Sequence, residues 1–287
     1  KADGTVDTKT TYFYHITGNE KATASQANAD SYMTESETRR GDNSLKQVSH
    51  YLGTEAGEEY MDWSQEWNYL GTTSKTVTTY TNDADGILLN STVYKDLDGV
   101  AISTKPTAAQ LAVKADFQKK SYTLYQNSGT KGSEKADYTQ NFKADGTVDT
   151  KTTYFYHITG NEKATATEAN ADSYMTESET KRGDNSLKQV SHYLGTEAGE
   201  EYMDWSQEWN YLGTVSKTVT TYTNDADGIL LNSTVYKDLK GLAISDKPTP
   251  AQLAVKADFQ KKSYTLYQNS GTKGSEKADY TQNFKAD

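Results

Sequence analysis

The sequence contains no cysteine, only three prolines and a small share of apolar residues. Without cysteine, the chain forms neither disulfides nor thiolate metal sites. Hydrophobic residues make up 34 % of the 287 residues, below the usual share of globular domains, so any core is thin. No apolar run approaches the ~18 residues of a membrane span, and we expect no membrane insertion in this segment.

Positive charge is also in short supply. Lysine and arginine number 30 against 40 aspartates and glutamates, which gives a net charge of −10. An acidic surface repels nucleic acid and anionic membranes, so we expect neither as a partner. The abundant residue is tyrosine, with 22 copies against 6 phenylalanines and 4 tryptophans, in a background rich in Thr, Ser, Asp, Asn and Gly. This composition is typical of strands and turns.

The chain repeats itself with a period of 142 residues. Residues 1–142 and 143–284 align without gaps and differ at eight positions, so 142 − 8 = 134 are identical, and residues 285–287 begin a third copy. The eight differences are Ser25/Thr167, Gln26/Glu168, Arg39/Lys181, Thr73/Val215, Asp98/Lys240, Val100/Leu242, Thr104/Asp246 and Ala108/Pro250. Such self-similarity indicates a window of a longer tandem array.

Near-identical copies favour a structural role over catalysis. One active copy suffices for catalysis, whereas the length of the molecule, the strength of multivalent binding and mechanical continuity grow with copy number. Isolated histidines and the absence of a triad order agree with this, and we expect a protein that is not an enzyme and has no cofactor.

Alternation with period two predicts strands throughout each copy. Turn signals between them are short, which predicts antiparallel neighbours. In the first copy the predicted strands are Val6–Ile16, Ser31–Arg40, Ser44–Leu52, Tyr60–Leu70, Ser74–Thr81, Ile87–Lys95, Phe117–Gln126 and Glu134–Lys143. Pro106–Asp116 carries a helix-start signal, and Gly18–Asp30 reads as a loop or short helix. The predicted fold is therefore all-β and antiparallel, with one or two short helices per repeat.

The junction between copies carries a hairpin signal instead of a spacer. Only Lys143-Ala144-Asp145-Gly146 separates two alternating runs, and no Gly/Ser-rich or Pro-rich linker occurs in the period. Two arrangements stay open: sandwich-like domains whose true frame is shifted, for example to 107–248, or one continuous sheet or solenoid.

Acidic turns offer the only metal candidates. In the sequence "NDADG", Asp83 and Asp85, repeated as Asp225 and Asp227, resemble a fragment of a calcium loop. The EF-type pattern is incomplete, because Thr81 occupies its first place and no acid closes it. Hairpin turns built from Asp and Gly explain the same residues. Calcium is therefore a weak candidate.

A second candidate is the tripeptide Arg-Gly-Asp, which resembles integrin-binding loops. It occurs as Arg40, Gly41 and Asp42 and again as Arg182, Gly183 and Asp184 at predicted turns. Ordinary turn chemistry accounts for it as well. The row of Trp63, Trp67 and Tyr69 predicts core, or a sugar-stacking platform if it faces water.

As a whole, the tandem, cysteine-free, acidic, Thr/Tyr/Gly/Asn/Asp-rich chain resembles giant repetitive bacterial surface proteins such as adhesin stalks, biofilm matrix proteins and extracellular fibres. The stretch Thr79–Asp96, "TYTNDADGILLNSTVYKD", is similar to YD-type shell repeats, although its rhythm is not sustained through the period. The resemblance implies an extracellular or cell-surface location and a role in extension, scaffolding or cohesion, with neighbouring repeats as partners and possible lateral self-assembly. The alternative is a multivalent adhesive module that binds a glycan, an integrin-like receptor or calcium.

Overall fold

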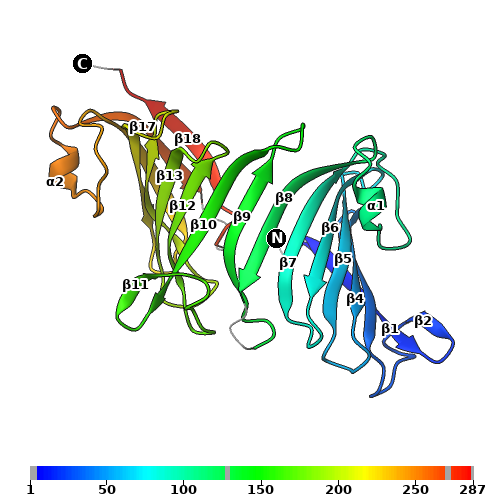
Figure 1. Ribbon diagram of the computed structural model, residues 1–287. Helices are drawn as coiled ribbons and strands as arrows, with labels where there is room; N and C mark the ends of the chain where they lie inside the picture. Colours follow the sequence, from blue (N-terminus) through cyan, green and yellow to red (C-terminus); the bar gives the residue numbers. More distant parts are fainter. Residues whose placement is uncertain (1–4, 127–129, 269–272, 286–287) are drawn as a thin grey trace. The chain divides into compact units, whose positions relative to one another are not determined.

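The computed structural model describes residues 5–126, 130–268 and 273–285, which divide into two units, Lys1–Thr147 and Val148–Asp287. Each unit is described by itself (Figure 1). Unit 1 contains β1 (Thr8–Ile16), β2 (Asn19–Ala22), β3 (Met33–Arg40), β4 (Leu45–Leu52), β5 (Tyr60–Trp67), β6 (Ser74–Asn82), β7 (Leu88–Asp96), α1 (Ala108–Leu111), β8 (Phe117–Gln126) and β9 (Lys135–Phe142).

Unit 2 carries the same succession of elements. They are β10 (Val148–Ile158), β11 (Asn161–Ala164), β12 (Met175–Arg182), β13 (Leu187–Leu194), β14 (Tyr202–Trp209), β15 (Ser216–Asn224), β16 (Leu230–Asp238), α2 (Pro250–Leu253), β17 (Phe259–Gln268) and β18 (Lys277–Asn283). The expected start of a third copy falls mostly on residues 286–287, outside the described residues.

Within each unit the strands form one antiparallel meander. In unit 1, β1 pairs with β3, and β3 to β9 then pair in chain order, while β2 folds back on the end of β1. Unit 2 repeats this scheme from β10 to β18. The described strands of a unit therefore form a single sheet, and the sandwich-like arrangement is wrong because no second sheet packs on it.

The predicted strands of the first copy are all confirmed, with ends that move by three residues at most. The helix in Pro106–Asp116 is confirmed as the single turn α1, which starts at a capping box between Thr107 and Gln110. In Gly18–Asp30 the structure has the strand β2, which the Ala-rich sequence did not predict. Gly18 (φ 81°) makes the tight turn that returns β2 onto β1.

One face of the sheet is lined by serine and tyrosine. Ser36, Ser49 and Ser64 lie directly opposite one another on β3, β4 and β5, and all three are buried. Tyrosines lean over them: the Tyr51 hydroxyl lies 3.1 Å from Ser36 Oγ. Because small side chains leave room for rings beside them, tyrosine rings can pack against this serine row.

The opposite face holds the apolar core. Because side chains alternate along a strand, Trp63, Gln65 and Trp67 point away from the serine row. In unit 2 this face holds a hydrophobic cluster of Trp205, Val219 and Phe259, with Ile244 and Leu253 packed against it. Those last two residues belong to the connection between β16 and β17, so this connection and the sheet share the core.

Candidate binding groove

The connection between β7 and β8 lies across the tryptophan face. We call this segment, residues 97–116 in unit 1 and 239–258 in unit 2, the strap. Its main attachment is Gln65, whose side chain is fully buried. Gln65 Nε2 donates to Val100 O at 2.7 Å and to Ser74 Oγ at 2.7 Å, and Gln65 Oε1 accepts from Ile102 N at 3.0 Å. Gln207 makes the same three bonds in unit 2.

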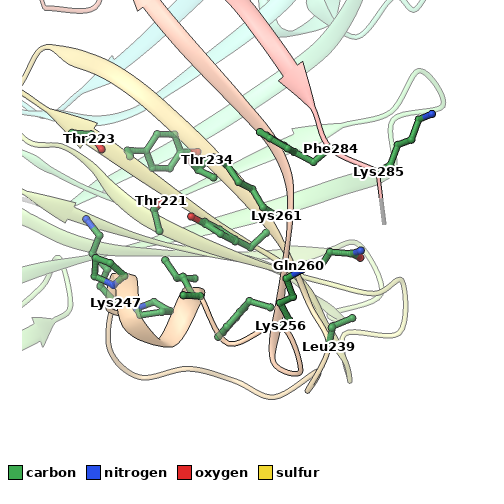
Figure 2. A pocket seen from close by; sticks show the side chains of 17 residues that line it. Thr221, Thr223, Thr234, Leu239, Lys247, Lys256, Gln260, Lys261, Phe284 and Lys285 are labelled. Carbon is green, nitrogen blue, oxygen red and sulfur yellow. The ribbon is translucent and has the colours of Figure 1, made fainter. Parts of the chain in front are cut away.

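A groove of about 810 Å³ lies between the strap of unit 2 and the sheet (Figure 2). Its wall on the strap side includes Lys247, Lys256 and the residues around α2, while Thr221, Thr223, Thr234 and Lys261 belong to the strands. The full lining is Thr221, Tyr222, Thr223, Thr234, Tyr236, Leu239, Lys247, Pro248, Pro250, Leu253, Ala254, Lys256, Phe259, Gln260, Lys261, Phe284 and Lys285.

Unit 1 has a groove of about 530 Å³ at the corresponding place. Lys105, Lys114 and Lys119 line it, together with threonines of β6 and β7. The other lining residues include Tyr80, Tyr94, Pro106, Leu111 and Phe117. Neither groove is lined by an aspartate or glutamate.

The lysines of the grooves differ in which neighbouring groups balance their positive charge. Lys247 Nζ lies 2.5 Å from Asp204 Oδ1, and Lys105 pairs with Asp62 in the same way. Lys119 lies over the Phe142 ring at 4.4 Å, and burial lowers its pKa from the ordinary value of lysine. Among the described residues no carboxylate pairs with Lys256. The groove of unit 2 therefore keeps positive charge on an acidic protein.

A second pocket of unit 1, about 470 Å³, lies on the other side of the strap and is acidic. The buried Glu35 carboxylate binds Lys21 Nζ at 2.7 Å and lies 3.5 Å from His50 Nδ1. The His50 ring stacks on Trp63 at 4.1 Å. Burial is the main reason that the His50 pKa is below its ordinary value, although Glu35 acts in the opposite direction. These charged groups are paired within the protein.

The Arg-Gly-Asp turn has a structural explanation at each position. Arg40 donates to Leu45 O at 2.7 Å and lies over the Tyr69 ring. A Cβ at Gly41 would come within 2.1 Å of Val6 O. Hydrogen bonds from the Ser44 hydroxyl and from the Ser44 N–H lower the pKa of Asp42. A receptor that binds the Arg40 guanidinium would first have to break its hydrogen bond to the backbone carbonyl of Leu45.

The turn in unit 2 is built alike. Arg182 donates to Leu187 O and Trp209 O. A Cβ at Gly183 would come within 2.1 Å of Val148 O. Asp184 accepts from Ser186 N at 3.0 Å.

Of the four calcium candidates, Asp83 and Asp225 use their carboxylates to hold their own turns together, and Asp85 and Asp227 take part through their backbone N–H groups. Asp83 Oδ1 accepts from the backbone N–H groups of Asp85 and Ile87 at 3.0 and 2.9 Å. Asp225 does the same with Asp227 and Ile229. Over residues 5–126, 130–268 and 273–285, no group of three or more His, Asp or Glu side chains converges as a metal site would require.

The aromatic row divides into two parts. Trp63 and Trp67 are 3 % and 8 % exposed, which confirms them as core, whereas Tyr69 lies beyond the end of β5 and is 73 % exposed. The two tryptophans are not available as a sugar-stacking platform.

Sequence reasoning missed the lysine grooves. Their residues are spread over three strands and a strap, and no short motif joins them. A signal was present: Lys105–Lys120 contains four lysines and one aspartate in a chain with net charge −10. None of the helices in the described part of the chain has the length and apolar character to cross a membrane.

Comparison with known proteins yields no family. No family model matches the sequence, and no curated protein matches it. Among solved structures, a porin-like protein from Bacteroides uniformis aligns with 83 % of this chain and 91 % of its own, at 11 % identity and a TM-score of 0.31. A Tc holotoxin pore of Photorhabdus luminescens aligns with 96 % of this chain at 15 % identity and a TM-score of 0.24, and the aligned part is 14 % of the toxin chain. At these TM-scores no shared fold, and no function, follows from the likeness.

Proposed function

We propose that this chain is a non-enzymatic segment of a long, repetitive extracellular or cell-surface fibre or stalk. Its role is extension, scaffolding or cohesion, with neighbouring repeats as its partners and with lateral self-assembly between chains. In this proposal the 142-residue sequence period is also the structural period, so length is the property that copy number increases.

The observation that carries the proposal is the way the chain leaves the first repeat. β9 ends at Phe142 and β10 begins at Val148. The intervening residues form a tight turn, with Lys143 N bonded to Thr147 O at 2.9 Å and Gly146 N to Lys143 O at 3.0 Å. A stalk that must transmit tension is better served by ordered backbone at this point than by a flexible spacer.

The construction of each unit supports the same role. Each unit consists of long paired strands, a thin core and a strap, and the acidic pocket of unit 1 has its Glu35 carboxylate paired within the protein. Cohesion through backbone ladders does not require a recognition site. Catalysis would need converging groups in a cleft, and the acidic pocket beside His50 has its carboxylate bound to Lys21.

Single-molecule force spectroscopy on the 287-residue chain tests the proposal. Unfolding each 142-residue period should release about 500 Å of chain, at about 3.5 Å per residue. We expect two rupture events with equal length increments and no soft extension before them. Featureless extension at low force would contradict a load-bearing role.

A second function, multivalent adhesion, is favoured by one observation, the lysine-lined groove that occurs in each unit. An array would then gain avidity from copy number even if each groove binds weakly.

A further inference from the structure

We propose that the groove beside the strap is a binding site for an acidic saccharide, that is, a sugar chain with carboxylate or sulfate groups. The inference goes beyond the mechanical role and does not depend on it. It gives the adhesive alternative a specific site and a specific ligand class.

Charge is the first argument. Lys247, Lys256, Lys261 and Lys285 line the groove of unit 2, and no acidic side chain lines it. Lys247 is paired with Asp204, which leaves Lys256, Lys261 and Lys285 as the lysines without a carboxylate among the described ion pairs. They come from both walls, as Figure 2 shows for the four labelled lysines. In a protein with net charge −10, an anion is repelled by most of the surface and attracted here. Several separated lysines fit a ligand with several negative groups better than a single ion.

The two strands that carry the groove threonines cannot take up a peptide as an added strand. β15 is paired with β14 and β16, and β16 is paired with β15 and β17, so neither strand offers a free edge. Recognition at these two strands therefore uses side chains. An acidic peptide would be held there without the backbone hydrogen bonds that an added strand gains.

The remaining side chains suit a sugar. Thr221 and Thr234 lie opposite each other on β15 and β16, and Thr223 follows on the same face, so three hydroxyls line one wall. Hydroxyls both donate and accept, as sugar hydroxyls do. Tyr236, Phe259 and Phe284 supply apolar surface, and Lys261 Nζ lies 4.6 Å from the Phe284 ring centre. The volume of about 810 Å³ is within the range of small-ligand sites.

The two copies differ most in the strap. Four of the eight differences between the repeats, at positions 98, 100, 104 and 108, fall within residues 97–116. A fifth, Thr73, contacts the strap at Gly99. One of these differences, Ala108/Pro250, lines the groove itself. Variation in a groove wall on a constant sheet is the pattern expected where copies adjust a ligand site.

The test is isothermal titration calorimetry on the full chain, with tetragalacturonate and a sulfated tetrasaccharide as acidic probes. Maltotetraose is the neutral probe, and hexaglutamate is the acidic peptide probe. We expect an acidic saccharide to bind with two sites per chain, to weaken as sodium chloride rises, and to bind more tightly than the other two probes. Tetragalacturonate alone would identify carboxylates, and the sulfated sugar alone would identify sulfates.

Paired variants locate the site. Lys114→Gln with Lys256→Gln removes one groove lysine from each unit and should weaken binding roughly fivefold. Lys75→Gln with Lys217→Gln removes the same charge from exposed positions of β6 and β15 outside the grooves, and should change affinity less than twofold. Both pairs should keep the unfolding temperature of the parent. The proposal is overturned if no acidic saccharide binds, if hexaglutamate or maltotetraose binds as well, or if the two pairs lose affinity equally.

Discussion

Gln65 Oε1 accepts a hydrogen bond from the backbone N–H of Ile102 at 3.0 Å, across 37 residues of sequence. The same side chain donates to the carbonyl of Val100, so one buried amide satisfies two backbone groups of the strap. Around Val100 and Ile102 the strap has no regular structure, so these backbone groups need a side-chain partner. This contact positions both the core of the unit and the groove beside it.

Replacing Gln65 with leucine should therefore loosen the strap. The change leaves Ile102 N, Val100 O and Asp96 Oδ2 without the hydrogen bonds that Gln65 makes, and we expect a loss of about 2–4 kcal/mol in the free energy of unfolding. Chemical denaturation measures it. Gln47→Leu is the matched control, because Gln47 bonds only Ser49 on the same strand and should cost under about 1 kcal/mol. Equal effects of the two changes would contradict the role of Gln65.

The second repeat suggests a stabilising change for the first. Ala108 is the first residue of α1, where the equivalent Pro250 starts α2. Proline suits this position, and its rigid backbone lowers the entropy of the unfolded chain. Ala108→Pro should raise the free energy of unfolding by about 0.5–1 kcal/mol. Thermal denaturation tests this, with Ala109→Pro as the control that should not stabilise, because it lies further inside the helix turn.

Two glycines with similar backbone angles should respond differently to alanine. Gly57 (φ 86°) has nothing within 4 Å of a built Cβ, whereas a Cβ at Gly86 (φ 75°) would come within 2.5 Å of the Tyr60 ring. Gly57→Ala should cost about 1 kcal/mol for the left-handed backbone alone. Gly86→Ala should cost roughly 1–3 kcal/mol more, because the half-buried ring must move. Equal losses in the free energy of unfolding, measured by urea denaturation, would show that contact with the Tyr60 ring does not destabilise Gly86→Ala.

The acidic turn distinguishes a structural from a metal-binding aspartate. Asp83→Asn keeps an oxygen that can accept from Asp85 N and Ile87 N, whereas Asp83→Ala removes it. If the turn alone needs this residue, asparagine should behave as the parent, alanine should lose about 1 kcal/mol, and millimolar calcium should not raise the melting temperature of any of them. If calcium raised the melting temperature of the parent but not of Asp83→Asn, Asp83 would be a calcium ligand.

Acid should destabilise the protein partly through His50 and His192. Burial is the main reason that both pKa values are below 6.5. For His50, Lys21 also lowers the pKa, whereas the negative charges of Glu35 and Asp62 raise it. A lowered histidine pKa means that the unfolded state takes up the proton first. The free energy of unfolding is therefore unaffected above about pH 6.5, falls as the pH drops below it, and levels off below the folded pKa.

The matched comparison for this prediction is the double variant His50→Gln with His192→Gln. Its free energy of unfolding should fall less steeply between about pH 7 and pH 5 than that of the parent. Only the slopes are compared, because glutamine also loses the stacking on Trp63 and Trp205. Parallel curves would show that carboxylates alone set the acid response.

The sequence by itself determined the period, the antiparallel all-β class and the position of every predicted strand of the first copy. Alternation of side chains is a local property of the backbone, and the turn residues between Val6 and Lys143 mark each reversal of the chain. The single turn of α1 was also readable, because its capping residues lie within four positions of each other.

Tertiary structure decided what the strands are used for. Whether Trp63 faced water or core depended on the strap, and the strap's position depends on Gln65, a polar residue in the middle of a strand that no pattern singles out. The turns at Arg40 and Asp83 carried recognisable motifs, yet their side chains bond to their own backbone. The lysines of the groove lie close together in sequence, but the threonines of β15 and β16 that face them do not. These residues meet only when the strap lies on the sheet, because long-range contacts, unlike periodicity, cannot be read from neighbouring residues.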